Sequence, residues 1–435
     1  MKIGIIGGGA SGMAAAIAAA DCGADVTILE QNDRIGKKIL ATGNGKCNLS
    51  NLDMSEQYYH SDNPERILPI LEQVTPEDTL AFFHDLGLMT KEKNGSCYPL
   101  CEQAAAVLDV LRFALERRGV SVETGCRVNG AEKKNGRFLV HIGRRESHRQ
   151  EVFDRIILAC GSRAGLKNDT EENGTALAGL FSLKRIPFTP ALVQLRCRES
   201  CFRALAGVRC QAEVTLRAGG HAYREYGELQ LTEYGISGIP VFQLSRHAAK
   251  ELKRRKTLPV MIDFLPQISR AEWETALQDR IGKMAGAAAE QFFTGTVHKK
   301  IAGVVLKESG ISPAAPVTGM ADRRLFDAGM RLKCFPVTVT GTNPFAQAQV
   351  CAGGVALTEI TDRMEAKRVS GLYVTGELLD ADGRCGGYNL QWAWATGIIA
   401  GRAAAEGAGR RLRGNITGGK YDTNTAATDT DRAYP

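Results

Sequence analysis

The apolar and polar positions of residues 1–30 predict the first half of a doubly wound α/β unit. An apolar run over 2–6 leads into the glycine turn GGGASG, and an alanine-rich stretch over 11–20 is followed by a second apolar run over 25–30. A short apolar run before a glycine turn is typical of a buried parallel strand, and the alanine-rich stretch is typical of a helix. We therefore expect strand, turn, helix and strand in this order.

Further helices and strands follow along the chain. Periodicity predicts helices at about 76–86 and 102–118, and short apolar runs predict strands at 120–123, 137–142 and 155–159. The last of these strands ends in another glycine turn, ACGSRAG, which contains Gly161. In open sheets of this kind, ligands bind in the crevice at the carboxyl ends of the strands.

A change in composition at Pro187 and Pro190 marks a second module. Residues 208–217 alternate between apolar and polar side chains, which is the period of a strand with one solvent-facing side. We also expect strands at 228–232, 259–263, 335–340 and 372–374, helices between about 267 and 310 with Ser269 as a cap, and a helix from Asn389 to about 405. The sequence thus predicts a nucleotide-binding domain split across both termini, with a module inserted at about 190–345.

Composition places the 435-residue chain among ordinary soluble proteins, with 44% apolar and 24% charged residues. The glycine turn interrupts the uncharged stretch 3–20, which argues against a signal peptide or a membrane helix. We therefore expect a cytoplasmic protein with no membrane partner. Beyond Gly414 the apolar anchors vanish, so residues 415–435 are expected to form a flexible tail.

The cysteines, the histidines and the net charge argue against several classes of protein. The 12 cysteines contain no CxxC pair, which is typical of free thiols and argues against a flavin disulfide reductase. The 7 histidines show no HxH or HExxH spacing, so no metal site is expected. The net charge of +7 is modest, and the basic clusters at 253–256 and 410–413 are expected to be solvated surface, which argues against a nucleic-acid partner.

Gly7, Gly9 and Gly12 form a GxGxxG motif in the context that makes it specific. The motif follows a strand, opens a helix and precedes Glu30, which ends the next strand. Gly7 permits the tight turn, Gly9 lets the backbone approach a pyrophosphate, and Gly12 lets helix and strand pack. The Glu30 carboxylate would accept hydrogen bonds from a ribose diol and repel a 2′-phosphate. The motif therefore predicts FAD or NAD rather than NADP, with an ordinary glycine turn as the alternative.

The segment RIGKKILATGNGKCNLSN, residues 34–51, suits a loop that hydrogen-bonds a ligand. Lys37, Lys38 and Lys46 bring positive charge to the crevice, and Gly43 and Gly45 bring backbone freedom. Phosphates and a flavin edge are natural recipients, and a turn-rich surface loop is the alternative.

A second glycine-rich cluster, GELLDADGRCGGYNLQ at 376–391, follows the apolar run at 372–374. A ligand held at both glycine clusters must be longer than a mononucleotide. A dinucleotide with a long reactive head, such as FAD, meets this requirement.

Five segments together resemble the YhiN/BaiN-like flavoproteins, also called aminoacetone-oxidase-family FAD-binding enzymes. These segments are KKILATGNGKCNLSN, GSCYPLCEQAAAVLDVL, GELQLTEYGISG, AQVCAGGVALTEI and GLYVTGELLDADGRCGGYNLQWAWATG. The resemblance covers nearly the whole chain except the tail. It implies an α/β fold with a Rossmann-like FAD-binding domain over 1–189 and 346–414, an inserted β-barrel-like domain over 190–240 and 310–345, and a small helical domain over 241–309.

Matching the motifs of this family implies which residues hold FAD. The ADP half would contact Gly7, Gly9, Ser11, Gly12 and Glu30, and Val128 would meet the adenine through its backbone. The pyrophosphate and flavin would lie near Lys38, Thr42, Gly43, Asn44, Gly45, Lys46, Cys47 and Asn48, with Gly161 as a further candidate. The ribityl chain and its phosphate would meet Gly376 and Glu377, the latter replacing an Asp that is frequent in FAD proteins of this broad type. Gly387, Asn389 and Leu390 would present a helix N-terminus to the flavin N1/O2 edge.

The helix expected after Asn389 carries two further spacings. Gly397 and Gly401 lie four positions apart, which predicts close helix packing. Trp392 and Trp394 lie two positions apart and cannot share a helix face, so we expect one in the core and the other at a domain interface.

The sequence indicates the cofactor more clearly than it indicates the reaction. No second GxGxxG follows a strand, so NAD(P)H or another electron donor must visit transiently. The resemblance implies a reductase that passes a hydride from flavin N5 to an enone-type double bond of a small-molecule substrate, because BaiN-like proteins are associated with 3-oxo bile-acid intermediates. Tyr388 and Tyr234 are the candidate proton donors, with packing roles as the alternative. An amine oxidase that produces hydrogen peroxide, and an RNA-modifying flavoprotein, stay open, although the dilute positive charge argues against the latter.

Overall fold

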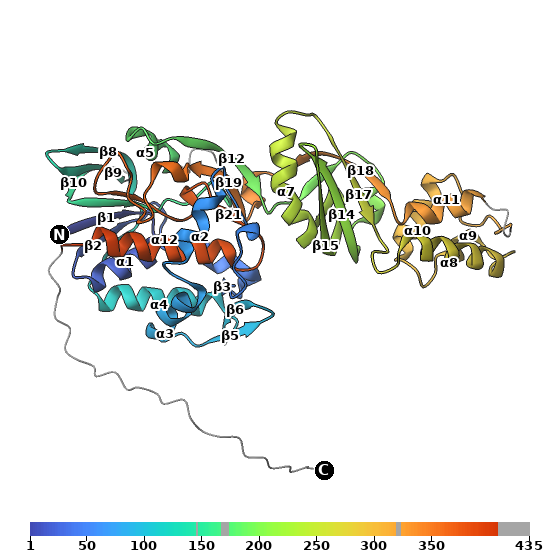
Figure 1. The fold of residues 1–435 in the computed structure, drawn as a ribbon, viewed down its shortest axis with the longest axis horizontal. Coiled ribbons are helices and arrows are strands. Elements are labelled where there is room, and N and C mark those ends of the chain that lie inside the picture. The colour runs from blue at the N-terminus through green and yellow to red at the C-terminus, as the bar shows by residue number, and fades with distance from the viewer. Residues whose placement is uncertain (145–146, 167–173, 319–322, 408–435) are drawn as a thin grey trace, which may run out of the picture.

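The computed structural model describes residues 1–144, 147–166, 174–318 and 323–407. An α/β domain, a barrel and a small group of helices follow one another along the long axis (Figure 1). The predicted flexible tail, 415–435, lies outside the described residues.

A five-stranded parallel sheet is the centre of the α/β domain, in the order β20–β11–β1–β2–β7. Its strands are β1 (Lys2–Ile6), β2 (Asp25–Leu29), β7 (Ser121–Glu123), β11 (Arg155–Leu158) and β20 (Leu372–Val374). The central strands are buried on both sides, as parallel sheets covered by helices require. Because β20 comes from the far end of the chain and pairs with β11, the domain is split across both termini, as the sequence predicted.

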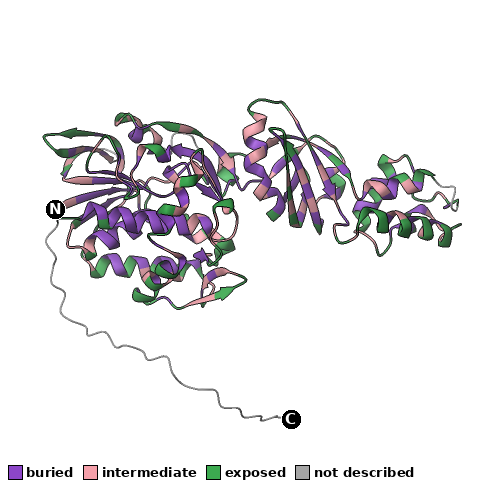
Figure 2. Cartoon of the chain, viewed as in Figure 1, coloured by how far each residue is buried: buried purple, intermediate pink, exposed green. Residues whose placement is uncertain are grey.

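The helices α1 (Ala10–Asp21) and α12 (Tyr388–Ala404) lie side by side and are buried along most of their length (Figure 2). A Cβ at Gly397 would lie 2.4 Å from the carbonyl oxygen of Ser11, and one at Gly401 would lie 2.2 Å from that of Ala15. The close helix packing predicted from the spacing of these glycines is confirmed. The other helices of the domain are α2 (Ile67–Leu71), α3 (Pro76–Asp85), α4 (Ala104–Arg117) and α5 (Gly174–Leu180).

Four smaller sheets surround this centre. Two of them join segments that lie far apart in the chain: β4 (Tyr59–His60) pairs with β21 (Asp382–Gly383), and β12 (Arg185–Ala191) pairs with β19 (Val350–Val355). The other two have the orders β10–β9–β8 and β3–β6–β5. Their strands are β3 (Ser50–Asn51), β5 (Thr90–Lys93), β6 (Ser96–Pro99), β8 (Arg127–Lys134), β9 (Arg137–Arg144) and β10 (Ser147–Phe153).

The inserted module contains a closed antiparallel barrel in the order β13–β16–β15–β14–β17–β18. Its strands are β13 (Leu195–Cys197), β14 (Arg209–Ala218), β15 (His221–Thr232), β16 (Gly235–Gly238), β17 (Leu258–Asp263) and β18 (Phe335–Thr342). Ala212, Val214 and Leu216 of β14 are fully buried, as the alternation of this segment predicted. The helices α6 (Phe202–Leu205) and α7 (Ile239–Leu252) pack on the barrel.

The small helical body consists of α8 (Arg270–Lys283), α9 (Ala289–Phe292), α10 (Lys299–Glu308) and α11 (Arg323–Arg331). Ser269 caps α8 by accepting a hydrogen bond from the Glu272 N–H, while the Glu272 carboxylate accepts one from the Ser269 N–H. This cap confirms the predicted start of the helix.

Two elements differ from the predicted division of the inserted module. The strand β17 completes the barrel, and α7 packs on it, although both lie within 241–309, which was assigned to the helical domain. The helix α11 packs against α8 and α10, although it lies within 310–345, which was assigned to the barrel. Local periodicity indicates whether a segment is helix or strand but not which body it packs against. Within the described ranges up to residue 407, no helix combines the length and apolar character that a membrane span needs.

Candidate FAD site

The turn between β1 and α1 has the backbone of an anion-binding loop. Gly7 has a φ of +110°, and a Cβ there would lie 2.4 Å from the carbonyl oxygen of Ala159. A Cβ at Gly12 would lie 2.0 Å from the Gly7 oxygen, so this position also requires glycine. A Cβ at Gly9 would meet no atom within 4 Å, which leaves the space beside this turn residue open to a ligand.

The first turn of α1 supplies donors at this turn. Gly9 is the N-cap, and it makes no side-chain cap. The first intrahelical bond runs from the Met13 N–H to the Gly9 oxygen, at 3.0 Å, so the N–H groups of Ala10, Ser11 and Gly12 have no partner within the helix. Free donors at the positive end of a helix dipole suit a phosphate, and the arrangement therefore fits the pyrophosphate of FAD.

Glu30 lies buried where β2 ends, beside the glycine turn. One carboxylate oxygen accepts a hydrogen bond from the Gly8 N–H at 2.8 Å, and the other accepts from the backbone and side-chain nitrogens of Asn32 at 2.8 and 2.6 Å. A carboxylate has about four acceptor sites, so one stays free for a ribose hydroxyl. In the structure Glu30 holds the glycine turn against the end of β2, and the ribose contact stays a prediction.

Val128 lies close to Glu30 in the fold. It is buried in β8, opposite Ile142, and the Cys126 N–H donates to the Glu30 carbonyl oxygen at 2.9 Å. The start of β8 therefore lies beside the position that the ribose would take.

The loop at 42–48 has an unusual backbone. Gly43, Asn44, Gly45 and Cys47 all have positive φ values, of 55°, 53°, 85° and 57°. Positive φ at residues other than glycine stores strain, and such residues cluster at ligand sites. Burial raises the pKa of the Cys47 thiol to about 11, so this cysteine is an inert, packed thiol.

Two more residues hold the same loop. Thr42 closes it by accepting a hydrogen bond from the Cys47 N–H on its carbonyl oxygen, at 3.1 Å. The side chain of Asn48 lies next to Gly387, where a Cβ would be 2.8 Å from its Oδ1. The loop is thereby packed against the start of α12.

The lysines of this region do not carry free positive charge, which corrects the prediction from the sequence. Lys37 pairs with Asp33 at 2.5 Å, Lys38 with Glu377 at 2.6 Å and Lys46 with Glu102 at 2.5 Å. Asp33 lies four residues before Lys37, whereas Glu377 and Glu102 come from distant segments, so sequence spacing gave no sign of the last two. The donors available for a phosphate here are thus mainly backbone N–H groups.

Glu377 joins three segments of the chain. Its Oε2 accepts hydrogen bonds from Lys38 Nζ and from Ser162 Oγ, at 2.6 and 3.0 Å. Ser162 follows Gly161, which has a φ of +73° and open space at its Cβ position. Gly376 lies against α1, since a Cβ there would be 2.5 Å from Ser11 Oγ. The structure therefore brings the predicted residues Ser11, Lys38, Gly161, Gly376 and Glu377 together, and it adds Ser162, which sequence reasoning missed.

The N-terminus of α12 also lies at this site. Gly387 is its N-cap with a φ of +95°, and a Cβ there would lie 2.5 Å from the Ser50 oxygen. The first intrahelical bond runs from the Gln391 N–H to Gly387, so the N–H groups of Tyr388, Asn389 and Leu390 have no partner within the helix. They form a second positive helix end that fits an anionic ligand edge.

The two tryptophans of α12 are both in the core, so the prediction of one interface residue was wrong. Trp392 is 1% exposed and donates from Nε1 to the Gly376 oxygen at 3.1 Å. Trp394 is fully buried and donates to the Leu49 oxygen at 3.1 Å. Although they point in different directions, both meet protein, because α12 is surrounded on most sides.

The two candidate proton donors lie in different surroundings. The ring of Tyr388 lies 5.1 Å from that of Tyr58, and burial raises the pKa of its phenol to about 12. Tyr388 is therefore protonated at neutral pH. Tyr234 lies in the turn between β15 and β16, where its carbonyl accepts from the Cys197 N–H and the Arg196 guanidinium lies 5.9 Å from its ring. Among the described residues, no hydrogen bond or ring contact joins the two tyrosines.

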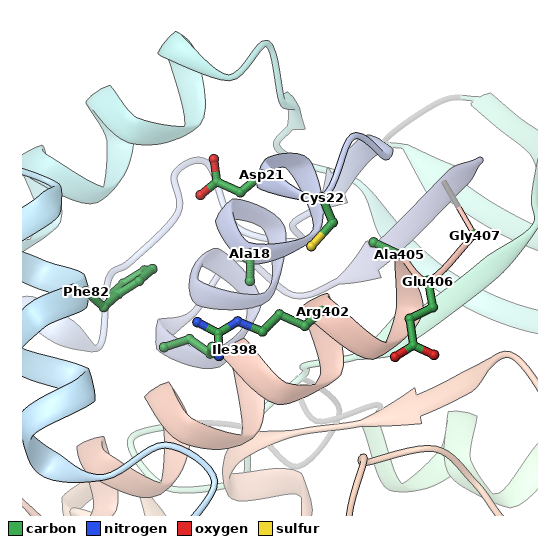
Figure 3. A pocket seen from close by; sticks show the side chains of 9 residues that line it. All are labelled: Ala18, Asp21, Cys22, Phe82, Ile398, Arg402, Ala405, Glu406 and Gly407. Atoms are coloured by element: carbon green, nitrogen blue, oxygen red, sulfur yellow. The ribbon is translucent and has the colours of Figure 1, made fainter. Parts of the chain in front are cut away.

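Two open pockets of the described residues lie away from the candidate FAD site. A cavity of about 350 Å³ lies between the C-terminal ends of α1 and α12 and is lined by Cys22, Phe82 and Arg402, among others (Figure 3). A second, of about 420 Å³, lies between β14 and the helical body. Neither is lined by a residue of the candidate FAD site.

Comparison with known proteins identifies the family. Residues 1–403 match the HI0933-like protein Rossmann domain family. The chain belongs to this family. It is an FAD-dependent oxidoreductase with a Rossmann-type FAD-binding domain.

Two curated relatives extend over nearly the whole chain. The 3-dehydro-bile acid delta(4,6)-reductase of Clostridium scindens is 45% identical over 409 residues, which cover 93% of this chain and 99% of the relative. The ribosomal RNA dihydrouridine synthase of Haemophilus influenzae is 27% identical over 398 residues, which cover 90% of this chain and 95% of the relative.

Proposed function

We propose that this protein is an FAD-dependent reductase that saturates a carbon–carbon double bond conjugated to a carbonyl group, with NAD(P)H as a transient electron donor. The observation that carries the proposal is the 45% identity to a delta(4,6)-reductase over almost the full length of both chains. The substrate class proposed is a small apolar molecule with an enone, of the kind that this relative's name describes.

In this proposal, each part of the candidate site holds one part of FAD or one proton. The N-terminus of α1 and the glycine turn hold the pyrophosphate, and Glu30 holds the ribose. The free N–H groups of Tyr388, Asn389 and Leu390 stabilise negative charge at the flavin N1/O2 edge. When bound, FAD supplies the hydride for the double bond. Tyr388, protonated at neutral pH, is the proposed holder of the proton that the neighbouring carbon receives.

The test is anaerobic reduction of the purified protein by NADH and by NADPH, followed through its visible absorbance, and then reoxidation by an enone or by air. The proposal expects bleaching by a nicotinamide, fast recovery with the enone and slow recovery with air. Rapid peroxide formation with added amines, and no bleaching by a nicotinamide, would instead support the amine oxidase.

A second candidate is reduction of uridine in RNA, and two observations favour it. A relative that covers 90% of this chain is named a ribosomal RNA dihydrouridine synthase. The positive charge, described above as dilute, is concentrated in the inserted module. Residues 192–345 contain 22 Lys and Arg against 14 Asp and Glu, a net charge of +8, which exceeds the +7 of the whole chain. A basic inserted module suits a phosphate backbone.

The two candidates share their chemistry, because the double bond of uracil is also conjugated to a carbonyl group. They differ in what the inserted module binds. Salt-dependent binding of ribosomal RNA, with dihydrouridine formed in it, would favour the RNA substrate. Turnover of a small enone without RNA binding would favour the first candidate.

A further inference from the structure

A short segment of the FAD-binding domain is in contact with the barrel. This segment, 380–385, lies between Gly376–Glu377 and the start of α12, and it contains β21, on the side of the domain that faces the barrel (Figure 1). Arg246 of α7 reaches from the barrel to β21, where its Nε lies 3.0 and 2.9 Å from the two carboxylate oxygens of Asp382. The side chains are only 8% and 3% exposed.

From Asp382 the contacts continue directly to the helix end. The next residue, Gly383, donates its N–H to Asn389 Oδ1 and accepts on its carbonyl oxygen from Asn389 Nδ2, both at 2.8 Å. A Cβ at Gly383 would lie 3.4 Å from the Asn389 nitrogen, so the strand lies against the first turn of α12. Arg246 is therefore connected through Asp382, Gly383 and Asn389 to the N–H groups that face the proposed flavin edge.

The ion pair is not explained by stability alone. Burial raises the pKa of Asp382 to about 6 although Arg246 acts in the opposite direction, so the loss of hydration outweighs the attraction. Arg246 Nη2 is buried without a hydrogen-bond partner in the described part of the chain, which adds a further penalty. A charged pair whose burial is costly but whose geometry is fixed suits a role in orientation.

We propose that Arg246 is a positioning residue: by holding β21 from the barrel, it fixes the N-terminus of α12 in the orientation that the flavin requires. Through this contact, the inserted module acts on cofactor binding from the barrel side of the domain. This inference rests on the proposed contact between α12 and the flavin, and it goes beyond that contact by making it depend on the barrel.

The test uses the full chain with Arg246→Met and with Lys250→Met as the matched control. Lys250 lies one turn further along α7 and also reaches the FAD-binding domain, at 3.5 Å from Asp62, but both side chains of this pair are exposed, at 40% and 53%. Two quantities are measured: the Kd for FAD and the amide hydrogen exchange of peptides that cover 380–392 in the apoprotein. We expect Arg246→Met to weaken FAD binding by about 10- to 100-fold and to speed exchange in these peptides. Lys250→Met should leave both close to wild type.

Equal behaviour of the two variants would overturn the proposal. If Arg246→Met does not fold, Asp382→Asn removes the charge of the partner while it keeps the shape, and the same two measurements apply. A wild-type chain that binds FAD but reduces no enone would refute the proposed reaction, while the FAD affinity and the exchange rates would still decide on Arg246. Amide hydrogen exchange in the apoprotein tests the role of Arg246 even if FAD does not bind.

Discussion

Lys38 Nζ lies 2.6 Å from Oε2 of Glu377, although 339 positions separate the two residues. Together with Ser162, this pair fastens the loop after the first glycine turn to the C-terminal glycine cluster. An N-terminal and a C-terminal segment of the FAD-binding domain thus meet through side chains of opposite charge at the candidate site.

We expect the Lys38–Glu377 pair to contribute little to stability, because Lys38 is half exposed. Lys38→Met and Glu377→Gln should each lower the free energy of unfolding by less than about 1 kcal/mol. The double variant should lose less than the sum of both, since each single change already removes the pair. Denaturant unfolding of the four proteins measures this coupling, and strict additivity would show that the pair does not interact in solution.

Glu30→Ala should weaken FAD retention and also lower stability. The second effect follows because the change leaves the buried N–H group of Gly8 without its acceptor, at about 1–3 kcal/mol, and also removes the acceptor of the more exposed Asn32 N–H. Glu30→Gln keeps one acceptor oxygen and should be milder in both respects. Thermal unfolding and FAD titration of the two variants measure the loss of stability and of FAD affinity. A Glu30→Ala variant with wild-type FAD affinity would contradict the ribose contact.

Gly401→Ala should destabilise the chain by about 1–3 kcal/mol, because the new methyl group would overlap the Ala15 carbonyl and push α1 away from α12. Gly303→Ala is the matched control. Gly303 is also inside a helix, α10, but a Cβ there meets no atom within 4 Å, so we expect a gain of roughly 0.5–1 kcal/mol from helix propensity. Equal signs for the two variants in denaturant unfolding would argue against the close helix crossing.

Asp382 gives a pH dependence with a defined sign. Its pKa is raised to about 6 by burial, above the value of about 3.9 in an unfolded chain. The folded protein therefore binds the Asp382 proton more tightly than the unfolded chain does. The contribution of this proton to the free energy of unfolding is complete below about pH 4 and is lost as the pH rises through about 6. Relative to wild type, Asp382→Asn should gain roughly 3 kcal/mol in free energy of unfolding between about pH 4 and pH 7. A difference that does not change with pH would show that Asp382 titrates normally.

Sequence patterns predicted the elements that depend on neighbouring residues. The strand, glycine turn and helix at 2–21 follow from local apolar runs and glycines, and so does the helix cap at Ser269. Patterns also predicted the approach of α12 to another helix, because Gly397 and Gly401 repeat at helical spacing. They could not indicate the partner, α1, since 380 or so residues of chain lie between.

Contacts between residues from distant segments could not be predicted from the sequence. The carboxylates opposite Lys38 and Lys46 come from other parts of the chain, and so do the protein atoms that surround both Trp392 and Trp394. Arg246 gave no signal at all, because a single arginine in an amphipathic helix looks like a surface residue. Only the arrangement of the domains shows that it is buried against Asp382.

The order of the segments along the chain also sets an order of events during synthesis. All strands of the barrel and all four helices beyond it lie between 195 and 342, so this module is complete while the sheet beside β11 still lacks β20. Ribosomes add about 5–20 residues per second, which leaves β1 and α1 without β20 and α12 for some tens of seconds. The part of the protein that is made first is therefore finished last, because α1 lacks its packing partner α12 during that interval.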